Sequence, residues 1–330
     1  DVQTAGDFTI QNTAVSQISS DNSITIGGDF KVLDDADFTV NNNAYLIQTK
    51  AGTNANTGSI KVNRAANIKR LDIVLWSPPV ASQNLLDFSP QTLLNRFFQF
   101  STGANNWSVM PDVATQSMGA TNGYAIRAPN DWSTSVAAFT GLFTGVPNSG
   151  NYTASIESSG QRFNLVGNPY PSTLNLRSLY DANSSLIENK FYFYEHTQSP
   201  ANVTSSITNY GVMTVGATTA YVTATDSPQS SNVANIESAE SAQVGQGFFV
   251  RALTGESGSL SFTNAMRGGN NNTVFFRNNV TSEEVSFEAS VFRIRFTDPN
   301  LSKSQALVGC FEDTNDGDDV MDTEGIGAVV

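Results

Sequence analysis

A run of acidic and amide side chains near the end of the chain has the chemistry of a metal site. Its members carry hard oxygen atoms and surround Gly317, which permits a sharp turn. They are Asp313, Asn315, Asp316, Asp318, Asp319 and Asp322. Because calcium takes about six to eight oxygen ligands, we interpret this loop as a calcium candidate, and no other cofactor is predicted. Its spacing is one residue short of the EF-hand pattern, so a solvated acidic loop is the alternative.

The side chains that could catalyse a reaction are few and scattered. His196, the single histidine, follows an aromatic strand without a Gly-x-Ser-x-Gly turn nearby, so we predict a polar surface residue rather than a general base. A hydrolase needs only two facing carboxylates, but the acidic residues here are spread over turns and tails. Trp107, Trp132, Tyr152 and Tyr210 are candidates for stacking on sugars, with core packing as the alternative. We predict no catalytic residue.

Composition excludes several classes of partner and site. The 330 residues include 17 Lys and Arg against 30 Asp and Glu, a net charge of -13, which disfavours nucleic acid because phosphate contacts need cations. A single cysteine, Cys310, allows neither an internal disulfide nor a zinc site built on cysteines. No apolar run is long enough for a membrane span. Little lysine and abundant Asn, Ser and Thr favour an extracellular location.

The beginning of the chain predicts repeated short strands. Residues 6–10, 28–32 and 36–40 share the order small, Asp, Phe, polar, β-branched, and each alternates apolar with polar residues. Clusters of Asn, Ser and Asp between them are typical of turns. Stacked rungs of this kind form a β-solenoid, whereas an antiparallel meander is the alternative. We therefore assign residues 1–62 to a repetitive, β-solenoid-like region of an all-β protein.

A second motif occurs twice later in the chain. Residues 122–128 and 246–252 share the order polar, Gly, aromatic, apolar, β-branched, Arg, Ala, and each follows a Pro-containing corner and an aromatic strand. The common order predicts two related β-sandwich or jelly-roll-like modules, module A at 63–155 and module B at 156–282. Residues 283–330 are predicted as a partial further β region that carries the acidic loop.

Two local features of the modules lead to separate expectations. The arginines that close the repeated motif, Arg127 and Arg251, are expected to neutralise a carboxylate or cap strand-end carbonyls, with an exposed rim position as the alternative. Short helices are predicted over 172–189 and over 85–95, the second interrupted by Pro90.

Residues 163–172, Phe-Asn-Leu-Val-Gly-Asn-Pro-Tyr-Pro-Ser, resemble a segment of large secreted and surface proteins of the Bacteroidetes phylum. Residues 123–129 and 262–267 are similar to further segments of the same proteins, and the likeness covers about residues 60 to 325. Such proteins typically leave the cell by the type IX secretion system, so the resemblance implies a secreted, cell-surface location. Cys310 stands where these proteins usually have an aromatic residue.

These observations lead to one functional hypothesis and one alternative. We predict a non-enzymatic structural or adhesive component of the cell surface, with self-association into a filament as one form and other surface proteins or glycans as further partners. Unpaired strand edges would provide the contacts for assembly. The alternative is a secreted module that binds or degrades polysaccharides.

Overall fold

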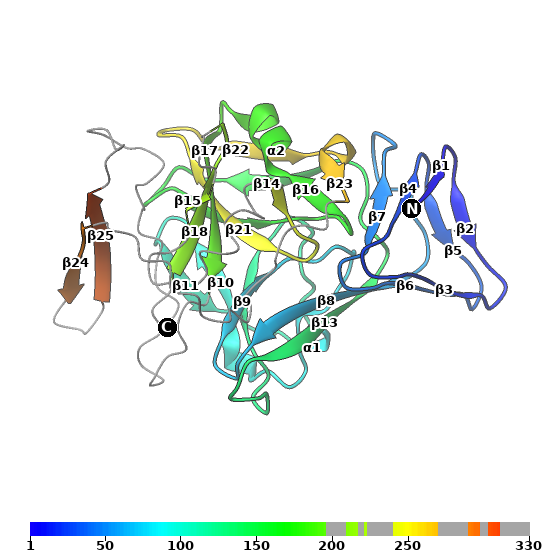
Figure 1. Ribbon diagram of the computed structural model, residues 1–330, viewed down its shortest axis with the longest axis horizontal. Coiled ribbons are helices and arrows are strands. Elements are labelled where there is room, and N and C mark those ends of the chain that lie inside the picture. The colour runs from blue at the N-terminus through cyan, green and yellow to red at the C-terminus, as the bar shows by residue number, and fades with distance from the viewer. Residues whose placement is uncertain (196–208, 217–220, 223–239, 270–289, 298–302, 311–330) are drawn as a thin grey trace.

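The structure, a computed structural model, describes residues 1–195, 209–216, 221–222, 240–269, 290–297 and 303–310. It is an all-β protein, as the sequence predicts, and the described residues include two short α-helices (Figure 1). Within these residues, no helix has the length and apolarity to cross a membrane. The last two strands form a separate antiparallel hairpin, β24 (Ser290–Thr297) with β25 (Lys303–Cys310).

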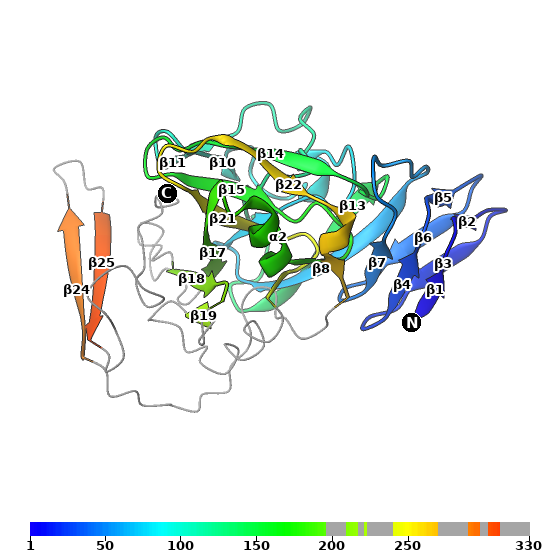
Figure 2. The same ribbon diagram turned by 90° about the horizontal axis from the view of Figure 1, so that it is seen from above.

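The first strands of the chain pair in parallel with the strands that follow one repeat later. One sheet contains β1 (Val2–Thr4), β4 (Ser23–Ile26) and β7 (Tyr45–Gln48). A second contains β2 (Phe8–Ile10) and β5 (Phe30–Val32), and a third contains β3 (Val15–Ile18), β6 (Asp37–Val40) and the long β8 (Ile60–Ile68). Paired positions lie 22 residues apart, as Asp7 and Asp29 do. Figure 2 shows these strands side by side at one end of the molecule.

The turns between these strands also repeat after 22 residues. Asn12 and the equivalent Asp34 have φ angles of 60° and 55°, and the Asn12 amide donates to the Asp34 carboxylate at 3.3 Å. Asp21 and Asn43 likewise have φ angles of 64° and 59°. Asn and Asp are the side-chain-bearing residues that best tolerate this left-handed region. The amide and acidic clusters in the sequence therefore mark the corners of the repeat.

The third copy of the Asp-Phe motif lies in a different sheet from the first two. Phe8 and Phe30 face one another across β2 and β5 with their rings stacked 5.9 Å apart. Phe38, from the third copy, lies in β6 and pairs with Ser16 of β3. The three copies therefore share a strand pattern, while only the first two share a structural position.

Exposed ion pairs join strands that are neighbours in the parallel stack. The carboxylate of Asp7 accepts a hydrogen bond from the Lys31 ammonium at 2.7 Å and from the amide of Asp29 at 2.9 Å. These two contacts lower the pKa of Asp7, the Lys31 contact most. A carboxyl with a lowered pKa stabilises the fold above its ordinary pKa and loses that contribution as the pH falls through the folded-state value.

We expect Lys31→Ala to raise the pKa of Asp7 toward the ordinary 3.8. An NMR titration of the carboxyl carbon measures it, and an unchanged pKa would show that Lys31 does not act on Asp7. Because both groups are exposed, only a small change in stability should accompany the shift.

Two stretches of the chain contain strands in a common order, and from here on we use module A for residues 60–145 and module B for residues 152–268. Module A has β8, β9 (Ile73–Trp76), α1 (Leu85–Phe88), η1 (Leu94–Arg96), β10 (Phe97–Ser101), β11 (Asn106–Val109), β12 (Tyr124–Arg127) and β13 (Ala137–Gly145). Module B has β14 (Tyr152–Ile156), β15 (Phe163–Gly167), β16 (Thr173–Asn175), α2 (Leu176–Asn183), β17 (Ile187–Glu195), β18 (Asn209–Thr214), β19 (Tyr221–Val222), β20 (Ser241–Ala242), β21 (Gly247–Ala252), β22 (Gly258–Phe262), η2 (Asn264–Met266) and β23 (Arg267–Gly268). Among the described residues, module B has four further short strands, β16, β19, β20 and β23. One central sheet runs β11-β10-β12-β9, and the other runs β15-β21-β17-β18-β19.

Equivalent strands of the two modules also pair in equivalent register. In β12, Tyr124 lies opposite Trp76, and in β21 the corresponding Phe248 lies opposite Val166. The two modules contact each other reciprocally at this point: Trp76 forms a bridge with Gln246, and Val166 forms one with Asn122. The amide of Ser77 donates to Gly245 at 2.9 Å, and that of the equivalent Gly167 donates to Thr121 at 3.0 Å. The modules thus meet as two related halves of a pseudo-symmetric contact.

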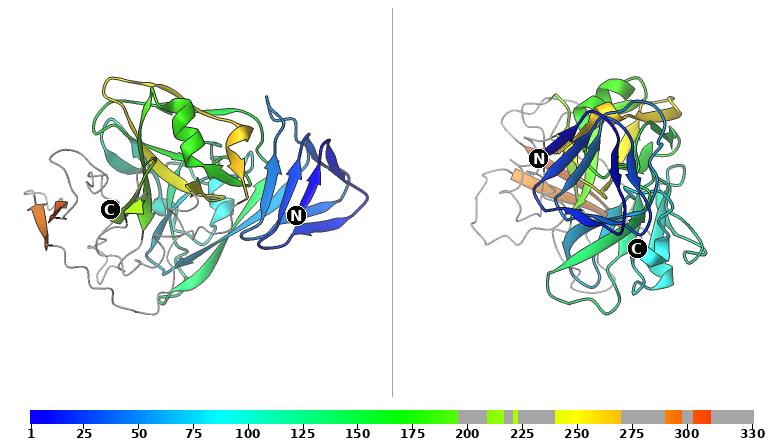
Figure 3. Two further views of the ribbon diagram at one scale, coloured as in Figure 1. Left: turned by 45° about the horizontal axis from the view of Figure 1, so that its top comes forward. Right: turned by 90° about the vertical axis from the view of Figure 1, so that its right-hand side faces the viewer.

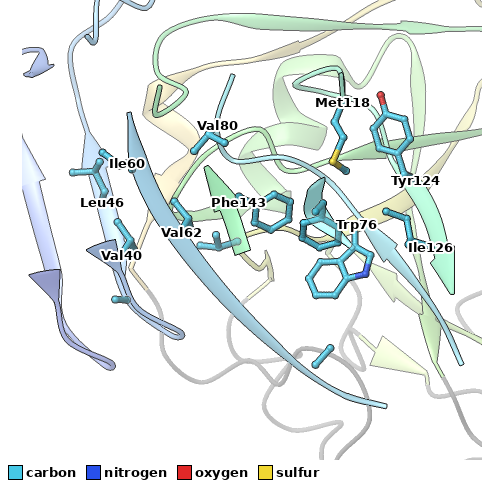
Figure 4. Close-up of a cluster of buried hydrophobic side chains, with 14 of the residues drawn as sticks. Val40, Leu46, Ile60, Val62, Trp76, Val80, Met118, Tyr124, Ile126 and Phe143 are labelled. Atoms are coloured by element: carbon cyan, nitrogen blue, oxygen red, sulfur yellow. The ribbon is translucent and has the colours of Figure 1, made fainter. Parts of the chain in front are cut away.

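The central sheets are buried on both faces. Trp76 of β9 is 1% exposed and packs with Phe143 of β13 in a first hydrophobic cluster (Figure 4). Its neighbour Leu75 points to the other face, where a second cluster joins β9 and β10 to Phe163 and Phe249 of module B. A third cluster joins the far side of the module B sheet to α2 and β22. Burial on both faces explains the continuous apolar runs in these strands. Figure 3 shows the ribbon from two further directions, with the N-terminal strands on the right of the left-hand view.

Both helices are shorter than predicted. Helix α1 ends at Phe88 instead of reaching residue 95, because Ser89 precedes Pro90 and residues before proline disfavour helical angles. Helix α2 spans Leu176–Asn183 rather than 172–189, since the flanking residues join β16 and β17. The side chains of Asn84 and Asn175 cap the two helix N-termini at equivalent places in the modules.

Candidate functional site

The predicted calcium loop and His196 lie outside the described residues. Within the described ranges, no group of three or more His, Cys, Asp or Glu residues is arranged to hold a metal ion. Calcium binding by the acidic loop therefore stays a prediction.

The four aromatic residues considered for sugar stacking pack in separate places. Trp107 and Tyr210 both contact the ring of Phe249 in the core between the modules, at 5.8 and 5.7 Å. Trp132 packs on Phe139 and donates its indole N–H to the carbonyl of Ile68. Tyr152 lies against Tyr170, 6.0 Å away. All four are partly buried, so the structure does not gather them on one surface.

The Asn-Pro-Tyr-Pro-Ser segment that carries the family resemblance forms a buried turn. Asn168 is fully buried, and its amide donates to the carbonyls of Ser172 and Gln243 at 2.8 and 3.0 Å. The oxygen of the same side chain accepts from the amide of Tyr170 at 3.0 Å. The phenol of Tyr170 donates to the carbonyl of Gly150 at 2.7 Å. Burial raises the pKa of this phenol, which keeps it in the donating, neutral form.

Arg267 joins this turn to the N-terminal strand stack. Its Nη2 donates to the carbonyl of Leu46 in β7 at 2.6 Å, and its Nε donates to the hydroxyl of Ser172 at 3.0 Å. Its Nη1 donates to the side-chain oxygen of Asn264 at 3.0 Å. The guanidinium also lies over the ring of Tyr170, 4.8 Å from its centre, which is a favourable cation–π distance.

Asn264, which accepts from Arg267, contacts two further segments of the chain. Its amide donates to the carbonyl of Lys50 at 2.6 Å and to the hydroxyl of Ser149 at 3.0 Å. Its oxygen accepts from the amide of Gly150 at 2.9 Å. The contacts of Arg267 and Asn264 therefore link the end of β7, the loop between the modules and the segment after β22.

The acceptors that Arg267 contacts among the described residues are hydroxyl, amide and carbonyl oxygens, so its charge is solvated by dipoles. Desolvation lowers the pKa of Arg267 to about 9, which still leaves the guanidinium protonated at neutral pH. The phenols of Tyr170 and Tyr152 act in the opposite direction. Because its donors are already engaged in the protein, the arrangement holds three segments together rather than presenting a reactive group. We call these residues the junction: Leu46, Lys50, Ser149, Gly150, Asn168, Tyr170, Ser172, Asn264 and Arg267.

Two segments of the junction stand out in the sequence, although not because of the contacts that they make. The segments containing Tyr170 and Arg267 resemble secreted proteins, and that likeness singled out both sides of the contact. It did not indicate that they meet, and nothing in the sequence singled out Leu46 or Lys50, because each contributes only its backbone carbonyl.

Fold and junction together define an all-β protein in which a stack of parallel strands is fastened to two related, mutually packed modules. Over residues 2–327 the chain matches the model of a family described as a domain of unknown function (DUF8693), and it belongs to that family. No curated protein and no solved structure matches the chain.

Proposed function

We propose that this protein is a secreted, non-enzymatic structural or adhesive component of the cell surface, exported by the type IX route that its Asn-Pro-Tyr-Pro-Ser segment suggests. In this proposal the N-terminal strands act as rungs of a β-solenoid-like stack, and modules A and B act as its rigid base. The paired modules and the junction support this assignment because their buried polar groups maintain the arrangement of strands.

The observation that carries the proposal is the sheet edge formed by β1, β2 and β3, which we call the first rung. Among the described strands, each of these three lies at the edge of its sheet. Val2 and Val15 on this rung are 53% and 84% exposed. Backbone groups at an open sheet edge pair readily with another strand, and exposed apolar side chains add to the contact.

We expect the full chain to self-associate through this edge, and Val15→Lys to weaken the association, because a charge on an edge strand opposes strand addition. Light scattering coupled to size exclusion, over a range of concentrations, measures the change. Leu94→Lys is the matched control, because Leu94 is likewise an exposed apolar residue, at 60%, but lies in η1 and not at this sheet edge. A wild-type chain that stays monomeric at high concentration, or equal effects of the two variants, would argue against assembly through the first rung.

A further inference from the structure

The arginines that close the repeated motif have different surroundings in the two modules. In module B, Nη1 of Arg251 lies 3.6 Å from the carboxylate of Glu188, and its Nε donates to the carbonyl of Gln161 at 3.3 Å. The guanidinium also lies over the ring of Phe163. Arg251 thus both pairs with a carboxylate and caps a carbonyl, the roles expected from the sequence.

Among the described residues, the equivalent Arg127 of module A has neither a carboxylate partner nor a backbone carbonyl that accepts from it. It is only 9% exposed, and within the described part of the chain it forms no ion pair. Its Nη2 donates to the side-chain oxygen of Asn130 at 3.2 Å, while its buried Nε has no hydrogen-bond partner. A buried guanidinium with an unused donor is costly unless another group solvates it.

Two further arginines lie at the same end of the module A sheet. Phe97 pairs with Ile126, so Arg96, the last residue of η1, directly precedes the end of β10 that lies beside Arg127. On the other side of β12, Arg127 pairs with Ile73, three residues after Arg70. Both Arg70 and Arg96 are partly exposed, and neither forms an ion pair with any described residue.

The electrostatics agree with this placement. Desolvation lowers the pKa of Arg127, and the positive charges of Arg96 and Arg70 lower it further. Like charges opposite each other on neighbouring strands destabilise a sheet. The chain has 30 acidic residues, yet no described carboxylate neutralises this group, whereas Glu188 serves both Arg162 and Arg251 in module B.

We propose that Arg70, Arg96 and Arg127 form a binding site for an oxyanion, namely a sulfate, phosphate or carboxylate group. Arg127 forms the buried base of the site, and Arg70 and Arg96 contact the anion from the solvent side. Guanidinium groups suit this chemistry because their planar N–H donors match paired oxygen atoms. The anion is either a free ion or the charged substituent of an acidic saccharide.

The test compares thermal unfolding of the full chain in millimolar sulfate or phosphate with chloride at equal ionic strength. We expect either oxyanion to raise the melting temperature by about 2 to 4 °C, since a ligand that binds only the folded state stabilises it. Arg70→Gln with Arg96→Gln should abolish the rise. Without oxyanion, the same double variant should melt at or above the wild-type temperature, because repulsion between the arginines is removed.

Two controls separate a site from general effects of salt and charge. Lys31→Gln with Lys61→Gln removes the same charge at exposed ion pairs elsewhere and should keep the sulfate response. Sulfated and unsubstituted dextran oligosaccharides then distinguish the sources: stabilisation by the sulfated form at lower concentration than free sulfate indicates a saccharide substituent, and equal potency indicates a free ion. An equal sulfate response in wild type and the Arg70/Arg96 double variant, or no response beyond chloride, overturns the proposal.

Discussion

Replacing Arg267 with alanine is expected to lower the free energy of unfolding by about 3 kcal/mol. The change removes donors to Leu46, Ser172 and Asn264 at 2.6, 3.0 and 3.0 Å. It also removes the cation stacked on Tyr170. Hydrogen bonds from a charged donor contribute more than neutral ones, and acceptors left buried without a donor incur a desolvation cost. Urea unfolding, read as a change in midpoint at constant slope, measures the loss.

The loss of stability in Arg267→Ala should begin at one place in the structure, the contact with β7. Because Arg267 binds the carbonyl of Leu46, hydrogen exchange in Arg267→Ala should accelerate first at the amide of Leu46, which donates to Pro171 at 2.8 Å. Arg177→Ala is the control: its guanidinium binds Glu240 at two points, but it is exposed, so its loss should cost less than about 1 kcal/mol. Equal losses in the two variants, or unchanged exchange at Leu46, would show that Arg267 does not fasten the strand stack to module B.

The sequence predicted the strands better than their partners. Alternation and turn residues are local, so they indicated strands around Phe8, Phe30 and Phe38, and the all-β class followed from them. Pairing partners depend on three-dimensional position, and for that reason the shared motif did not show that the third copy joins a different sheet from the first two. Helix lengths were overestimated, because pairing of Thr173–Asn175 into β16 outweighed the helical pattern around it.

For the candidate sites too, the sequence indicated individual residues but not the groups that they contact. The duplicated motif identified Arg127 and Arg251 as equivalent, but only the structure shows that Glu188 lies beside one of them. Likewise, the resemblance pointed to Asn168 and Arg267 without the carbonyls that they bind. Backbone carbonyls are present in every residue, so no residue type in the sequence marks those that a guanidinium will use.

Gly167→Ala is expected to destabilise the protein by about 3 kcal/mol, because the new methyl group has no space. A Cβ at this position would lie 2.2 Å from both the Cβ and the Oγ of Ser77. Ser77 is fully buried, so the clash cannot be relieved by turning toward solvent. Gly6→Ala is the control, since a Cβ there meets nothing within 4 Å, and its effect should be small.

Ser77 and Gly167 occupy equivalent positions in the two modules. Ser77 follows Trp76, which pairs with Tyr124, and Gly167 follows Val166, which pairs with the equivalent Phe248. The pseudo-symmetric contact therefore has room for one Cβ and not for two. Ser77→Gly should rescue Gly167→Ala, so that the double variant is more stable than Gly167→Ala alone and the coupling energy reaches about 2 kcal/mol. Urea unfolding of the four proteins completes this double-mutant cycle. If the two changes are simply additive, the modules do not meet through this pair, and the internal symmetry has no role in their packing.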